Sequence, residues 1–103
     1  MGDRLAALRK MLEKNPDEPR LRFGVALELL GRGRLEEGVE ELQRYLAGTD
    51  DEGNAWGRLG HALRELGREE EAREAYRKGV EAAERHGHPT MAEEFEEVLE
   101  DWS

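Results

Sequence analysis

The chain has 103 residues, enough for one small domain, and it contains no cysteine, which excludes disulfides and thiolate metal sites. Charged residues make up 40% of it and the formal net charge is −9, which argues against nucleic acid and anionic membrane surfaces as ligands. No apolar stretch approaches the ~20 residues of a membrane span, and residues 1–12 lack the apolar core of a signal peptide. We therefore expect a cytoplasmic protein.

Apolar residues recur at helical spacing in six segments of the chain. Asn15-Pro16 ends the first segment, Asp17 is a candidate N-cap for the second, and Gly67 is a suitable C-terminal stop for the fourth. The sequence therefore predicts helices at residues 3–14, 19–30, 35–47, 54–66, 69–85 and 90–102.

The chain also nearly repeats itself with a period of 34 residues. When residues 22–46 are laid on residues 56–80 without a gap, Gly33 meets Gly67 and apolar positions meet apolar positions. A period of this length, built from two short helical patterns, is typical of a helix–turn–helix array. Such an array is a scaffold that presents a surface, so the repeat indicates a binding protein and leaves its ligand open.

Seven positions of the repeat carry its pattern: a bulky residue, a Leu, a small residue and an aromatic or Leu, then a Gly, a small residue and a bulky one. This pattern resembles the tetratricopeptide repeat. The better copy is Trp56, Leu59, Gly60, Leu63, Gly67, Ala72 and Tyr76, and the poorer copy is Arg22, Val25, Ala26, Leu29, Gly33, Gly38 and Leu42.

The resemblance implies an all-α fold of six antiparallel helices in a short right-handed superhelix. It covers two full repeats, at residues 19–52 and 53–86. Residues 1–16 then look like the second half of a preceding repeat, and residues 87–103 look like the first half of a following repeat, used as a C-terminal capping helix. We expect a single domain and a small stand-alone bacterial member of the family. Abundant Glu and Arg with few amides also resemble thermophile composition, with halophile acidity as the competing explanation.

The sequence offers little for catalysis. The only serine is Ser103 and both threonines fall in loops, so no nucleophile stands beside a base. His86 and His88 would need a third ligand to hold a metal. The alternative is that His86 interacts with the carbonyls that end its helix while Gly87 forms a left-handed cap. We expect no catalytic residue, no metal and no cofactor, and hence no enzyme.

Glutamates fall in runs along the last two predicted helices. Such runs are usually solvated helix faces, with basic partners four residues away, such as Lys78 for Glu74. We therefore expect these carboxylates to lie at the surface rather than in a catalytic site.

In this family, the first helix of each pair lines a concave groove in which peptide segments bind. The resemblance therefore implies a site in the second and fourth helices. Arg58, His61 and Arg64 are spaced three apart and form one basic ridge, beside an apolar patch on the second helix. The residues expected to face the groove are Arg20, Phe23, Leu27, Leu30, Asn54, Arg58, His61 and Arg64.

A basic ridge beside an apolar patch suits a peptide with apolar anchors and an acidic group or C-terminal carboxylate. The alternative is that the arginines of the ridge pair with nearby glutamates such as Glu28 or Glu65. On that alternative, Phe23 and Leu27 pack against the first helix and leave no free surface.

We expect a non-enzymatic protein–protein interaction module, a scaffold or adaptor that binds a peptide segment of a partner protein in the groove. The partners expected exclude nucleic acid and membrane, and the chain itself is expected to be a monomer or weak homodimer. The second hypothesis is a self-assembling structural subunit that dimerises or stacks through an end helix. The last helix has one continuous apolar face, which either caps the preceding helix or projects as an interface, and its residues are Met91, Phe95, Val98 and Trp102.

Overall fold

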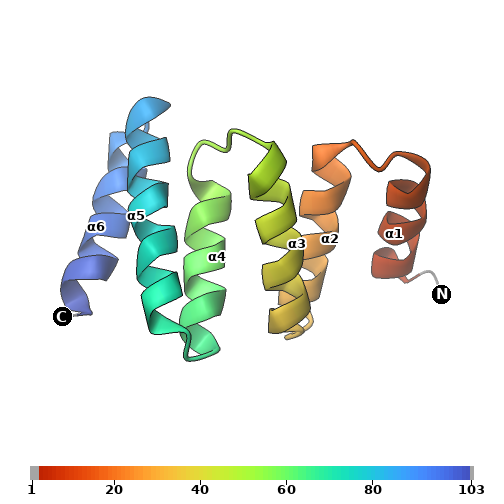
Figure 1. Ribbon diagram of the computed structural model, residues 1–103, viewed down its shortest axis with the longest axis horizontal. Helices are drawn as coiled ribbons and strands as arrows, with labels where there is room; N and C mark the ends of the chain where they lie inside the picture. The colour runs from red at the N-terminus through yellow and green to blue at the C-terminus, as the bar shows by residue number, and fades with distance from the viewer. Residues whose placement is uncertain (1–2, 103) are drawn as a thin grey trace. The chain divides into compact units, whose positions relative to one another are not determined.

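The computed structural model describes residues 3–102, and this part of the chain folds into six α-helices without a strand (Figure 1). Each helix begins and ends within one residue of the predicted bounds, so the predicted all-α fold is confirmed. None of the described helices is long and apolar enough to cross a membrane. The helices are α1 (Arg4–Lys14), α2 (Pro19–Gly31), α3 (Leu35–Gly48), α4 (Asn54–Glu65), α5 (Glu69–Arg85) and α6 (Pro89–Asp101).

Contacts divide the chain into two compact units, an N-terminal unit, Met1–Thr49, and a C-terminal unit, Asp50–Ser103. In the N-terminal unit α2 packs against both α1 and α3, and in the C-terminal unit α5 packs against both α4 and α6 (Figure 1). Each unit therefore contains one complete helix pair, α2 with α3 or α4 with α5, and one additional helix.

The turns inside the two helix pairs have the same backbone geometry. Gly33 and Gly67 both adopt a left-handed conformation, with φ of 77° and 78°. The following amide in each turn bonds back into the preceding helix: Arg34 donates to the Leu29 carbonyl at 3.0 Å, and Arg68 donates to the Leu63 carbonyl at 2.9 Å. Only glycine adopts this φ without strain, which is why the same residue recurs at this point of the 34-residue period.

The residue at the N-cap of α4 is Gly53, which has no side chain to accept a hydrogen bond, and the predicted cap of α2 is wrong. Asp51, before α4, accepts hydrogen bonds from the amides of Gly53 at 2.8 Å and Ala55 at 2.9 Å. Its equivalent one period earlier is Asp17, but the residue two positions after Asp17 is proline, which has no amide to donate. Glu18 caps α2 instead, and its side chain accepts from the Arg20 amide at 3.2 Å.

Each unit has its own apolar core. In the N-terminal unit, Leu5 of α1 is buried against Val25 and Leu29 of α2, with Leu8 and Leu12 packed around them. In the C-terminal unit, the core lies between α4 and α5 and contains many small residues. Its buried apolar residues include Ala55, Leu59, Ala62, Leu63, Ala72, Ala75 and Tyr76.

One predicted surface ion pair forms with a different partner. Glu74 lies 3.5 Å from the Arg77 guanidinium, three residues away, rather than pairing with Lys78. Lys78 places its ammonium 5.4 Å from the centre of the Trp56 ring, where the indole face attracts a cation. The carboxylate lies at the surface as expected, because Glu74 is exposed.

Candidate functional site

The α2 residues expected in the groove lie on one stripe of that helix in the N-terminal unit. Arg20, at its start, is exposed, whereas Phe23, Leu27 and Leu30 are half-buried. The Phe23 ring packs on the Tyr45 ring of α3, with centroids 4.9 Å apart and planes tilted by 32°. The ring contact of Phe23 is therefore with α3, whereas the alternative from the sequence placed it on the first helix.

Leu30 packs at the seam between α2 and α3. A methyl group added at Gly38 would lie 2.5 Å from the Leu30 Cδ2 atom, so the glycine provides the space that this side chain occupies. Leu30 remains only half-buried there. The α2 stripe therefore contributes to packing within its unit and still presents apolar surface to solvent.

The α4 residues expected in the groove lie in the C-terminal unit, and they differ in whether their side chains already contact other residues of the chain. Asn54 begins the helix and is half-buried, whereas Arg58, His61 and Arg64 are exposed. His61 Nε2 lies 2.9 Å from a carboxylate oxygen of Glu65, the residue that the sequence offered as a partner for the arginines. Within residues 3–102, the Arg58 side chain forms no hydrogen bond or ion pair, so its guanidinium is available to a ligand.

Arg64 is engaged by an aromatic residue that the sequence did not associate with it. Its guanidinium carbon lies 4.2 Å from the centre of the Trp102 ring, and the guanidinium of Arg73 lies 5.1 Å from the same ring. Tyr76 meets Trp102 edge-on, with centroids 6.0 Å apart, and burial raises the pKa of the Tyr76 phenol. These residues come from three elements of the C-terminal unit, so no local spacing could have predicted the cluster.

The apolar face of α6 is directed into the C-terminal unit. Phe95 fills a notch between α4 and α5: a methyl group added at Gly57 would lie 2.5 Å from its ring, and one added at Gly79 would lie 2.9 Å from it. A methyl group added at Gly53 would likewise lie 2.9 Å from the Met91 sulfur, which occupies the space beside this glycine. This packing favours the capping role of α6 over an interface formed by its apolar face.

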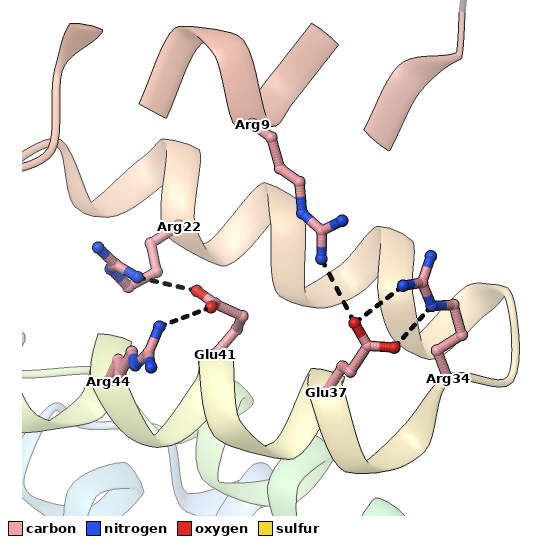
Figure 2. Close-up of polar contacts among 6 residues, drawn as sticks. All are labelled: Arg9, Arg22, Arg34, Glu37, Glu41 and Arg44. Atoms are coloured by element: carbon pink, nitrogen blue, oxygen red, sulfur yellow. Dashed lines mark hydrogen bonds and ion pairs between the residues drawn. The ribbon is translucent and has the colours of Figure 1, made fainter. Parts of the chain in front are cut away.

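Two arginine–glutamate networks lie in the N-terminal unit (Figure 2). In the first, Glu41 accepts from Arg22 at 2.8 Å and from Arg44 at 3.1 Å. Both arginines also line a cavity of about 260 Å3 at the start of α2 and the end of α3. Arg44 and Glu41 are three residues apart and could have been paired from the sequence, whereas the contact of Arg22 with Glu41 joins two helices.

The second network is centred on Glu37 of α3 (Figure 2). Arg34 donates two hydrogen bonds to this carboxylate at 2.8 Å, and Arg9 of α1 lies 3.5 Å from it. The Arg34 guanidinium holds the pKa of Glu37 below its ordinary value. Arg9 therefore connects α1 to α3, a contact that the sequence pattern did not indicate.

The histidine that raised the possibility of a metal site is engaged by a carboxylate. The His86 ring lies 3.1 Å from Asp50, which also accepts from Arg85 at 2.6 Å, and these contacts lower the pKa of Asp50. The predicted interaction of the His86 ring with helix-ending carbonyls is thus replaced by a contact that fastens the loop before α4 to the end of α5. Gly87 has the expected left-handed φ, 74°. No cluster of three or more metal-ligating side chains occurs in the described part of the chain.

Comparison with known proteins identifies related chains over most of this sequence. A family model described as tetratricopeptide repeat matches residues 1–83. The TPR repeat-containing protein PA0015 of Pseudomonas aeruginosa is 35% identical over 83 residues, which cover 81% of this chain and 79% of that protein. The small glutamine-rich tetratricopeptide repeat-containing protein 2 of Mycosarcoma maydis is 35% identical over 80 residues, which cover 78% of this chain and 23% of that protein.

The fold also resembles a solved structure. The solution structure of protein BPP2914 from Bordetella parapertussis matches with a TM-score of 0.83 and 25% sequence identity, over 98% of this chain and 88% of that one. The shared fold, the family match and the 34-residue period with glycine turns agree with one another. The chain therefore belongs to the tetratricopeptide repeat family, a family of protein–protein interaction modules.

Proposed function

We propose that this chain binds a peptide segment of another protein along the first helix of each repeat, α2 in the N-terminal unit and α4 in the C-terminal unit. The observation that carries the proposal is the apolar stripe of Phe23, Leu27 and Leu30. These side chains lie three and four residues apart on α2 and all remain half-exposed. Burial of an apolar anchor against such a stripe contributes about 1.5–3 kcal/mol for a side chain of the size of Val, Leu or Phe.

Recognition of an acidic group on the peptide is assigned first to Arg58. Its guanidinium is exposed and unpaired among the described residues, so it can form two parallel hydrogen bonds to a carboxylate without losing an existing partner. His61 and Arg64 would first have to leave Glu65 and Trp102, and we assign them a secondary part together with Arg20 and Asn54.

The test is affinity capture from a lysate of the source organism with three forms of the chain. The first is the wild type, and the second is Leu27→Glu/Arg58→Glu, which disrupts both the apolar stripe and the free guanidinium. The third is Ala47→Glu/Arg77→Glu, which changes charge equally at exposed positions of α3 and α5. Circular dichroism of each form verifies that the helices are intact.

A protein retained by the wild type and the control, and lost from the α2/α4 variant, would support the proposal. A partner retained equally by all three forms would overturn it, since neither surface would then contribute. Capture of nothing by any form, at protein concentrations well above micromolar, would also count against a peptide-binding role.

A further inference from the structure

The two units differ sharply in charge. The N-terminal unit contains nine acidic and nine basic residues, whereas the C-terminal unit contains sixteen acidic and seven basic residues. The whole net charge of −9 therefore belongs to the C-terminal unit.

The acidic excess is concentrated on α6, which contains six acidic residues and no basic one. Its apolar face is turned into the C-terminal unit, so its carboxylates cover the opposite, solvent-facing side. This acidic face consists of Glu93, Glu94, Glu96, Glu97, Glu100 and Asp101, all exposed.

The first helix has the opposite character. Between Arg4 and Lys14, α1 contains four basic residues and one acidic residue. Lys10 and Lys14 lie four residues apart, are exposed, and form no ion pair within residues 3–102. Beside them lies Met11, 50% exposed and the only large apolar side chain that is exposed in the described part of the chain.

The surface beside α1 is also hollowed. A cavity of about 610 Å3 is lined by α1 residues that include Leu5 and Lys10, and it extends to Arg34 at the start of α3. Arg9, Lys10 and Arg34 make its lining more basic than acidic, since Asp3 and Glu13 are its acidic members. The free side of α1 therefore combines basic side chains, an exposed methionine and a depression.

We propose that α1 of one copy of this chain docks on the acidic face of α6 of a second copy. The observation that carries the proposal is that the two faces have opposite charge, α1 with four basic residues and one acidic residue and α6 with six acidic residues and no basic one. Because different surfaces meet, the association is head-to-tail. A contact of one helix with another is small, so the association is transient and sensitive to salt.

The first measurement is sedimentation velocity of the full chain over a range of concentrations at about 20 mM and about 500 mM salt, which differ several-fold in Debye length. The expected result is an average mass that rises with concentration at low salt and returns to that of the monomer at high salt. A chain that stays monomeric at low salt up to millimolar concentration would overturn the proposal and identify the acidic face as a solvating cap.

Two charge-reversed variants then locate the contact. Lys10→Glu/Lys14→Glu reverses the free basic residues of α1, and Glu93→Lys/Glu97→Lys/Asp101→Lys reverses one ridge of α6. Each variant alone is expected to be monomeric, because the reversals take the net charge of α1 from +3 to −1 in the first and that of α6 from −6 to zero in the second, which removes the attraction between the two faces. The α6 variant is decisive here, since it lowers the net negative charge of the chain and so reduces general repulsion between copies.

An equimolar mixture of the two variants should associate again, because the carboxylates introduced on α1 of one variant then meet the lysines introduced on the α6 ridge of the other. A variant that was merely misfolded would not recover on mixing. Association that persists in either variant alone, or a mixture that stays monomeric when the wild type associates, would overturn the α1–α6 contact.

Discussion

The two units contain the same helix pair but fill its seam in different ways. Phe23 and Tyr45 form a ring pair between α2 and α3. At the equivalent positions one period later stand Gly57 and Gly79, and the Phe95 ring of α6 occupies the space between them. The period therefore preserves the backbone, whereas the side-chain volume comes from the pair itself in one unit and from the covering helix in the other.

At a second pair of equivalent positions, one unit has a smaller residue facing a larger one than the other unit does. In the N-terminal unit the small residue is Ala26 and the large one is Leu42, and both are fully buried. In the C-terminal unit Gly60 faces Tyr76, and a methyl group at Gly60 would lie 2.7 Å from the tyrosine ring. The larger ring requires the smaller partner, because packed interiors leave no spare room.

The units also differ in the interactions that join their helices at the surface. In the N-terminal unit, Arg9 and Arg22 reach across helices to Glu37 and Glu41. In the C-terminal unit, an aromatic cluster around Trp102 connects α4, α5 and α6. Arg9 and Glu37 are exposed, and an exposed ion pair is screened by salt, so we expect the N-terminal unit to be the more sensitive to ionic conditions.

The largest expected effect on stability comes from removing the Phe95 ring from the notch between α4 and α5. Phe95→Ala removes the ring between Gly57 and Gly79, where the surrounding glycines have no side chains with which to close the space. We expect the free energy of unfolding to fall by about 3 kcal/mol, the lower end for removal of a phenylalanine ring, because Phe95 is only half-buried. Urea denaturation measures the change, and a loss below about 1 kcal/mol, the size of a typical point-mutant effect, would contradict the notch as a main support of α6.

The next largest effect on stability is expected to differ between Asp51 and Asp17, which occupy equivalent positions of the two repeats. Asp51 is 4% exposed and accepts two amide hydrogen bonds, so Asp51→Ala leaves buried donors unpaired and should cost about 2 kcal/mol. Asp17→Ala is the matched control: Asp17 is exposed and is not the cap of α2, so its loss should change stability by less than about 0.5 kcal/mol. Equal losses in the two variants would mean that the two helix starts are alike after all.

A smaller change in stability tests whether the size of residue 60 must match the size of residue 76. Gly60→Ala should destabilise by about 1–2 kcal/mol because its methyl group meets the Tyr76 ring. Adding Tyr76→Leu reproduces the Ala26 and Leu42 pair of the other unit and should recover part of that loss, with a favourable coupling of about 0.5–1 kcal/mol in a double-mutant cycle. Simple additivity of the two losses would show that the seams are not interchangeable.

The smallest effect is a dependence on acid. Four exposed carboxylates have pKa values lowered by arginine partners, so the folded chain binds fewer protons than the unfolded chain near the ordinary carboxyl pKa of about 4. Stability should therefore be complete above that range and fall as the pH drops through and below it. Hydrogen exchange measured separately for the two units should show the loss of stability in both. Two of the four carboxylates, Asp3 and Glu37, lie in the N-terminal unit, and the other two, Asp50 and Glu71, lie in the C-terminal unit.

Part of the proposed binding surface could be read from the sequence and part could not. The spacing of Arg58, His61 and Arg64 places them on one ridge of α4, and the structure has all three exposed there. The partner of Arg64 was not predictable, because Trp102 comes from the end of another helix. The assignment of these residues and of the α2 stripe to peptide binding is the proposal that the capture experiment tests.

The sequence by itself determined the helices and the turns, because these depend on residues within a few positions of one another, and it indicated the family through the 34-residue period, which is visible in the chain without its fold. An apolar stripe needs only its own spacing, and the turns at Gly33 and Gly67 need only a residue that tolerates positive φ. The tertiary structure alone decided which side chains fill each seam. Phe95 could be matched to Gly57 and Gly79 only once three helices were packed together, because packing depends on the volumes of residues far apart in the chain.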